Sequence, residues 1–152
     1  MRVWRLTKQR YAKKLDGEGA RIYGSRWNSI GKPMVYTASS LSLALLEQVV
    51  RLDPDEIPDD FVSVSIEIPD SISKMHISFN EFPNNWHEPE MASWFKKKGD
   101  AWLDEQKTVA LVAPSIIINE EMNILLNPLH HDIKQVKIIG IKPFSFDMRL
   151  FN

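Results

Sequence analysis

The sequence predicts a single α+β domain, in which a bent or split β-sheet core is flanked by a few helices. Polar and apolar residues alternate over 61–68, and apolar residues recur at helical spacing over 41–52. A length of 152 residues, of which 43% are hydrophobic, fits one domain with a sizeable core. This composition excludes disordered and fibrous proteins. We therefore expect one domain that spans residues 1–152.

The strands are predicted first from the alternation. Val62, Val64, Ile66 and Ile68 lie on one face of the segment 61–68, and polar residues lie on the other. A period of two is typical of a half-buried strand. Branched or aromatic residues indicate further strands at 3–6, 34–37, 107–113 and 135–141.

The clearest helix is predicted at residues 41–52. Ser39 or Ser40 can cap its first turn, and the pair Asp53-Pro54 ends it because the residue before proline resists the helical conformation. Weaker helical patterns cover residues 7–14 and 90–94, whereas 16–29, 80–89 and 127–132 are typical of loops.

Charge and cysteine content exclude several functions. Nineteen Lys and Arg against 20 Asp and Glu give a net charge of −1, which argues against a broad nucleic-acid-binding surface. The absence of cysteine removes disulfides, Cys-ligated metals and thiol nucleophiles. No apolar run approaches the ~20 residues that span a bilayer, and the first residues turn polar too soon for a signal peptide. We expect a soluble, cytoplasmic protein that binds neither nucleic acid nor membrane directly.

Three segments offer candidate chemistry, and each also has a plain structural interpretation. Glu47 either pairs with Arg51 on the helix surface or points into a cleft between helix and sheet. In G-S-R-W-N, Arg26 can bind phosphate or carboxylate and Trp27 can stack, or the segment is a polar turn whose Trp27 fills the core. Tyr36 is either a core tyrosine with a satisfied hydroxyl or a ligand contact.

Other motifs argue against common enzyme classes. Ser115 lacks the G-x-S-x-G pattern of serine hydrolases. The four histidines show no metal-binding spacing, and the adjacent pair His130-His131 is expected to diverge, so no metal site is predicted. The acidic segment 53–60 does not follow the calcium-loop pattern.

Short motifs follow one another in a fixed order along almost the whole chain. They are residues 3–6 (VWRL), 15–21 (LDGEGAR), 24–28 (GSRWN), 35–40 (VYTASS), 44–47 (ALLE), 99–103 (GDAWL), 113–115 (APS), 125–128 (LLNP) and 144–151 (FSFDMRLF). Each motif is weak by itself, but their order and spacing are specific. Together they resemble the RES-domain family, the toxins of Xre–RES toxin–antitoxin pairs.

The resemblance implies a fold similar to that of ADP-ribosyltransferases, in which a split sheet holds NAD+. It also implies that NAD+ is the substrate, that no separate cofactor is needed, and that a cognate Xre-type antitoxin covers the active site. The family is named for an Arg, a Glu and a Ser, which match Arg26, Glu47 and Ser115, and Tyr36 matches its active-site tyrosine. Whether the chain also forms a homodimer within such a complex stays open.

These residue types suit cleavage of the nicotinamide–ribose bond, which develops positive charge on the ribose. Arg26 would bind the diphosphate, and Tyr36 would stack on a ring or donate its hydroxyl. Glu47 would oppose the developing charge, while Ser115 would orient Glu47 or contact the ribose. Further substrate contacts are expected from Arg5, Trp27, Asn28 and Asn127.

The acceptor of the ADP-ribose group is open at this point: water, phosphate and a protein side chain all fit the residues. Three other classes compete with an NAD+-cleaving enzyme. They are a non-catalytic NAD- or nucleotide-binding module, a ribonuclease, and a structural partner without a small ligand. The near-neutral charge and sparse basic clustering argue against the ribonuclease.

Overall fold

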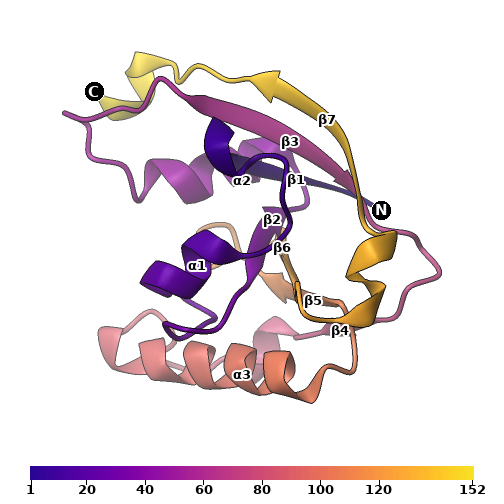
Figure 1. The fold of residues 1–152 in the computed structure, drawn as a ribbon. Helices are drawn as coiled ribbons and strands as arrows, with labels where there is room; N and C mark the ends of the chain where they lie inside the picture. The colour runs from indigo at the N-terminus through magenta and orange to yellow at the C-terminus, as the bar shows by residue number, and fades with distance from the viewer.

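A bent sheet of seven strands in the order β4-β5-β6-β2-β1-β3-β7 runs through the structure, a computed structural model that describes residues 1–152 (Figure 1). All neighbouring strands are antiparallel except β4 and β5. The strands are β1 (Arg2–Lys8), β2 (Val35–Ala38), β3 (Phe61–Glu67), β4 (Lys74–His76), β5 (Ala110–Pro114), β6 (Met122–Leu126) and β7 (Lys137–Pro143). The α-helices are α1 (Glu18–Tyr23), α2 (Leu41–Val49) and α3 (Ala92–Glu105), and five short 3₁₀ turns complete the chain.

The sheet is almost divided in two at β1. This strand pairs with β3 over its full length, from Arg2↔Glu67 to Lys8↔Phe61, but with β2 through the single registered pair Trp4↔Ala38. The β1-β3-β7 half and the β4-β5-β6-β2 half therefore diverge, as the upper and lower parts of Figure 1 show. The predicted α+β class and split sheet are confirmed.

The helices cover the two halves of the sheet separately. Helix α2 buries Leu43 and Ala44 in a cluster with Leu6 and Phe61. Helix α3 buries Phe95 and Trp102 against the lower half, together with Trp27 from the segment after α1. Helix α1 lies between these two packed layers (Figure 1), and its residues line a cavity together with Arg5 of β1 and Tyr36 of β2.

Local patterns predicted the central elements well. The alternating segment forms β3 (Phe61–Glu67), and the periodic helix forms α2, which ends at Val49 and continues as hydrogen-bonded turns to Leu52. Ser40 rather than Ser39 caps α2, because its side chain accepts a hydrogen bond from the Leu43 N–H at 3.1 Å.

Other expectations were wrong where long-range pairing or packing decides the structure. Residues 7–14 form no α-helix, since Thr7 and Lys8 extend β1 against β3 before a short 3₁₀ turn at Gln9–Tyr11. The predicted loop 16–29 contains α1, which follows Gly17 in the left-handed conformation at φ 66°. Helix α3 is far longer than 90–94, and strands β4 and β6 were not predicted. No helix combines the length and the apolar character needed to cross a membrane.

Candidate active site

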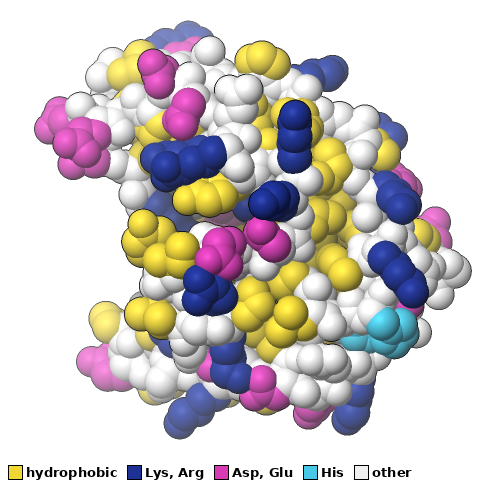
Figure 2. Space-filling view, in the orientation of Figure 1, with side chains coloured by type: hydrophobic (Ala, Val, Ile, Leu, Met, Phe, Trp, Pro, Cys, Tyr) yellow, Lys and Arg dark blue, Asp and Glu magenta, His cyan; other side chains and the backbone are white.

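A groove opens where the two halves of the sheet diverge. Three adjoining cavities form this groove, and Tyr36 and Arg51 line all of them. The two larger cavities measure about 450 and 470 Å³, within the range of small-molecule sites (~300–1,000 Å³). Figure 2 shows the surface hollowed on its left side, with Lys and Arg side chains beside the hollow. The groove is therefore large enough for a ligand of nucleotide size.

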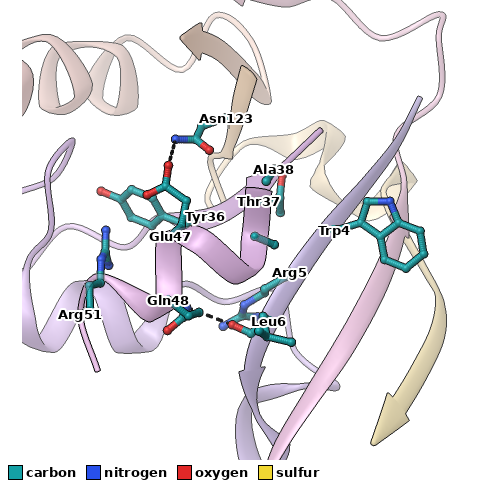
Figure 3. A pocket seen from close by; sticks show the side chains of 11 residues that line it. Trp4, Arg5, Leu6, Tyr36, Thr37, Ala38, Glu47, Gln48, Arg51 and Asn123 are labelled. Atoms are coloured by element: carbon teal, nitrogen blue, oxygen red, sulfur yellow. Dashed lines mark hydrogen bonds between the residues drawn. The ribbon is translucent and has the colours of Figure 1, made fainter. Parts of the chain in front are cut away.

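Glu47 projects from α2 into this groove and borders two of its cavities (Figure 3). Its Oε1 accepts hydrogen bonds from Asn123 Nδ2 at 2.8 Å and from Ser115 Oγ at 3.0 Å. Its Oε2 has no hydrogen-bond partner in the protein, and Glu47 forms no ion pair with Arg51. The surface-pair interpretation of Glu47 is thus wrong, and one carboxylate oxygen is left for a ligand.

The buried Ser115 hydroxyl holds the Glu47 carboxylate in place. The side chain of Ser115 is 0% exposed, just after β5. Its Oγ accepts hydrogen bonds from the Ile117 and Ile118 N–H groups at 3.0 and 3.2 Å and donates to Glu47. Since the hydroxyl is fully used inside the protein, Ser115 orients Glu47 and does not reach a ligand.

Arg26 lies in the segment between α1 and β2 and lines the same cavity as Glu47. Its guanidinium stacks on the Phe95 ring, with 5.1 Å from Cζ to the ring centroid, and it forms no ion pair. Burial lowers the pKa of Arg26 from its ordinary value, and the nearby Glu47 carboxylate partly offsets this effect. An arginine so placed, charged and without a carboxylate partner, is suited to bind an anion.

Tyr36 presents its ring to the groove while its hydroxyl is held by the protein. The hydroxyl donates to Asn28 Oδ1 at 2.7 Å and accepts from the Trp27 N–H at 3.0 Å. Burial raises the pKa of Tyr36 to about 12, so the hydroxyl stays protonated at neutral pH. Of the two roles expected for Tyr36, stacking fits this geometry better than donation from the hydroxyl.

The structure corrects the expected substrate contacts of Trp27 and Asn28, because both side chains point inward. Trp27 is 2% exposed, and its ring packs edge-on against Phe95 at 5.1 Å, so its side chain fills the core although the residue belongs to the wall of one cavity. Asn28 is fully buried, and its Nδ2 donates to the carbonyls of Ala20, Ser29 and Lys32. Asn28 therefore holds the segment that carries Arg26.

Helix α3 holds the same segment from the other side. Lys96 Nζ donates to the Ser25 and Asn28 carbonyls, and Asp100 accepts from the N–H and Oγ of Ser29. Gly99 allows the close approach, since a Cβ at this position would lie 1.7 Å from the Trp27 carbonyl oxygen. Gly99 and Asp100, both within the motif 99–103, thus hold the segment that carries Arg26.

Gly99→Ala is expected to destabilise the protein by roughly 1–3 kcal/mol or more, because the added methyl group must push α3 away from Trp27. Thermal unfolding followed by circular dichroism measures the effect as a lower Tm. Gly19→Ala is the matched control, since a methyl group added there would have no neighbour within 4 Å and alanine favours a helix. Equal melting temperatures for the two variants would contradict the close packing.

Arg5 on β1 is among the expected substrate contacts, and it lines two of the three cavities. Its Nη1 donates to the Lys14 carbonyl at 3.2 Å, and it forms no ion pair. Burial lowers the pKa of Arg5 from its ordinary value, against a smaller opposing effect of Asp16. The Arg5 guanidinium therefore contacts backbone carbonyls and lines the groove without a carboxylate partner.

The expected substrate role of Asn127 is wrong. Its side chain is 1% exposed, donates to the Leu103 carbonyl at 3.1 Å and accepts from the Leu129 N–H at 3.1 Å. It holds the turn after β6 and lines none of the three cavities. Asn123, four residues earlier, is the asparagine in the groove, and it was missed because β6 was not predicted.

Cationic side chains far outnumber carboxylates in the lining of the groove. Glu47 is its single carboxylate, and none of its cationic side chains forms an ion pair. The cations are Arg5, Lys8, Arg10, Arg26, Arg51 and Lys96. The net charge of −1 thus conceals a local basic surface, which suits a ligand with anionic groups and one electron-poor centre.

The adjacent histidines lie outside this groove. His130 and His131, which we expected to diverge, stack with their ring centroids 4.3 Å apart, and their donor atoms lie within 4.8 Å of those of Asp132. His130 Nδ1 already accepts the Asp132 N–H at 3.0 Å, so this nitrogen caps the 3₁₀ turn at His131–Gln135.

Comparison with known proteins places the chain among relatives. The model of the RES domain matches residues 2–148. The chain is 36% identical over 152 residues to Toxin Res of Photorhabdus laumondii subsp. laumondii, covering 99% of this chain and 97% of that protein. It is 37% identical over 141 residues to the Prs ADP-ribosylating toxin of Sphingobium sp., covering 91% and 88%.

A solved structure shares the fold. The crystal structure of the M. tuberculosis MbcT–MbcA toxin–antitoxin complex contains a chain that matches with a TM-score of 0.74 at 16% identity, covering 95% of this chain and 84% of that one. The expected fold, similar to that of ADP-ribosyltransferases, agrees with this match. With a domain match over nearly its whole length and relatives above 30% identity, the protein belongs to the RES-domain family.

Proposed function

We propose that this protein is the toxin of a toxin–antitoxin pair and that it breaks down NAD+ by cleaving the nicotinamide–ribose bond. One observation carries the proposal: a carboxylate held on Oε1, with Oε2 free, lies in a groove whose other charged side chains are unpaired cations. The names of the two relatives support it, since both are named toxins and one of them is named an ADP-ribosylating toxin. NAD+ is an ADP-ribose donor found in the cytoplasm, where the protein would act.

The cations of the groove suit the diphosphate. Guanidinium groups bind phosphate oxygens in pairs of hydrogen bonds, and Arg26 offers its fork without a competing carboxylate. Arg51 lines all three cavities and is the second cation placed to reach the phosphates. The Tyr36 ring, whose hydroxyl is held by Asn28, forms a rigid surface for a ligand ring.

Glu47 suits the ribose. As the C–N bond breaks, its electron pair leaves with nicotinamide, which departs as a neutral molecule, and positive charge develops on the ribose. The free Oε2 of Glu47 can accept hydrogen bonds from ribose hydroxyls and oppose this charge. An acceptor oxygen then bonds to the ribose carbon and loses its proton to solvent. Because the leaving group is already cationic in NAD+, the step needs no strong general acid.

A cognate Xre-type antitoxin is proposed to cover the groove, and DNA contact would then belong to that partner. Support comes from the apolar side chains left exposed around the groove, Tyr23 (77%) and Val50 (62%). The chain with the shared fold was solved within a toxin–antitoxin complex.

The proposal is tested by incubating the purified protein with NAD+, with and without inorganic phosphate, and resolving the products by mass spectrometry. We expect nicotinamide release equal to NAD+ loss, with ADP-ribose formed in water or ADP-ribose 1″-phosphate formed in phosphate. Induction in cells is expected to lower NAD+ and leave RNA intact. Stable NAD+ under all of these conditions would contradict the proposal and favour a non-catalytic binding module.

ADP-ribosylation of a protein is the second candidate, because one relative is named for that activity. It requires the same bond cleavage but a protein side chain as acceptor. Labelled NAD+ in a cell extract distinguishes the two, since label on a protein band indicates transfer and label only in small molecules indicates NAD+ breakdown.

A further inference from the structure

Asn123 occupies a position fixed from both sides by the sheet. It lies on β6, paired with Ala38 of β2 on one edge and with Ala113 of β5 on the other. Its side chain lines two of the three cavities, and in Figure 3 it lies directly against the Glu47 carboxylate. A side chain on a central strand moves little, so the amide is held at a defined place beside α2.

Both hydrogen bonds to Glu47 end on the same oxygen. Asn123 Nδ2 lies 2.8 Å from Oε1, and Ser115 Oγ lies 3.0 Å from it. Ser115 is itself held by the Ile117 and Ile118 N–H groups. Because both donors bind Oε1, they fix the rotation of the carboxylate group as well as its position.

The two hydrogen bonds on Oε1 oppose the attraction of the Glu47 carboxylate to the cations around it. Arg26 faces it from the segment after α1, Arg51 follows on from α2, and the neutral Tyr36 faces it from β2. Neither arginine forms an ion pair with Glu47 in the structure. A carboxylate free to rotate would be drawn toward these cations, and a closed ion pair would remove both groups from the ligand.

We infer that Asn123 is a positioning residue, whose amide, together with Ser115, holds Oε1 of Glu47 so that Oε2 faces the ribose and the arginines stay free for phosphate. This inference rests on the proposed function. On this inference, a residue of β6 determines which carboxylate oxygen of Glu47 faces the ligand. This strand carries none of the residues after which the family is named.

The kinetic test compares Asn123→Ala with a matched control, Asn85→Ala. The control removes an asparagine amide that donates to the Glu88 carboxylate at 3.0 Å, and neither residue lines the groove. We expect Asn123→Ala to lower kcat for NAD+ loss roughly ten-fold with little change in KM, since one of two donors is lost. The control should keep the unmodified rate. In the double variant Ser115→Ala/Asn123→Ala, the loss should exceed the product of the single losses, because either donor partly replaces the other.

Asn123→Asp supplies a readout that a merely structural role would not move. Protonated aspartic acid donates to Glu47 much as the amide does, whereas ionised aspartate repels it, and two carboxylates at this distance titrate as a coupled pair. The activity of Asn123→Asp relative to the unmodified protein should therefore rise as the pH falls from about 8 to about 5. A ratio that stays constant across this range overturns the inference.

A crystal structure of Asn123→Ala separates this inference from the proposed function. We expect the Glu47 carboxylate to be turned toward Arg26 or Arg51, whether or not the protein consumes NAD+. A carboxylate unmoved in that structure overturns the positioning role. If instead the unmodified protein leaves NAD+ intact while the carboxylate moves as expected, the proposed reaction fails and the positioning of Glu47 stands.

Discussion

Replacement of Glu47 by Gln is expected to slow NAD+ loss by about a hundred- to a thousand-fold, equivalent to ~3–4 kcal/mol, without loss of the fold. Glutamine keeps the shape of the side chain, and its carbonyl oxygen can still accept from Asn123 and Ser115. Its amide nitrogen then lies where Oε2 was, so only the negative charge that faces the ligand is lost. The effect is therefore expected on kcat.

Purified Glu47→Gln is assayed for NAD+ loss beside Glu56→Gln, which neutralises an exposed carboxylate without an ion pair in the acidic segment 53–60. Circular dichroism checks that both variants are folded. Undiminished NAD+ consumption by folded Glu47→Gln would contradict the role of the Glu47 carboxylate in the reaction. Ser115→Ala is expected to cost less than Glu47→Gln, and the reverse order would give Ser115 the more direct role.

Arg26→Ala is the second variant expected to abolish most NAD+ loss, by about a hundred-fold, with the fold preserved. The half-buried guanidinium has no carboxylate partner whose charge would be left uncompensated, so its removal costs the protein chiefly the contact with the Phe95 ring. The ligand, in contrast, loses a bidentate donor to its phosphates. Weaker NAD+ binding should accompany the loss of rate.

Arg26→Lys distinguishes charge from geometry. Lysine keeps the positive charge but lacks the planar fork, so we expect partial activity, between those of Arg26→Ala and the unmodified protein. Arg149→Ala is the control, because Arg149 pairs only with Asp147 at the surface. Equal NAD+ turnover by Arg26→Ala and Arg149→Ala would show that Arg26 does not bind the substrate.

Much of the fold could be predicted because its information is local. The alternation over 61–68 and the helical spacing over 41–52 describe β3 and α2 without reference to the rest of the chain. Strand β6 and most of α3 escaped prediction, because β6 is defined by pairing with β2 and β5, and α3 mixes Lys, Gly and Asp with its buried aromatics.

In the candidate site, too, some residues could be predicted from the sequence and others only from the structure. Arg26, Tyr36 and Glu47 were found from their motifs, and the structure brings all three to one groove. Asn127 was expected to contact the substrate, but its side chain bonds to the Leu103 carbonyl and to the turn after β6, and the asparagine that contacts Glu47 is Asn123. Asn123 lies within β6, between β2 and β5, whereas Asn127 follows the end of that strand, where its side chain is bonded inside the protein.

By itself, the sequence determined the class of fold, the absence of cysteine and three charged candidates, Arg5, Arg26 and Glu47, since composition, periodicity and motif order are properties of the chain alone. The tertiary structure decided which atoms are free to act. Ser115, Tyr36 and Asn28 have their polar groups satisfied inside the protein, whereas Glu47 keeps one open oxygen and Arg26 an open guanidinium. The reason is physical: a hydrogen bond between residues far apart in the sequence exists only once strands β2, β5 and β6 have brought them together.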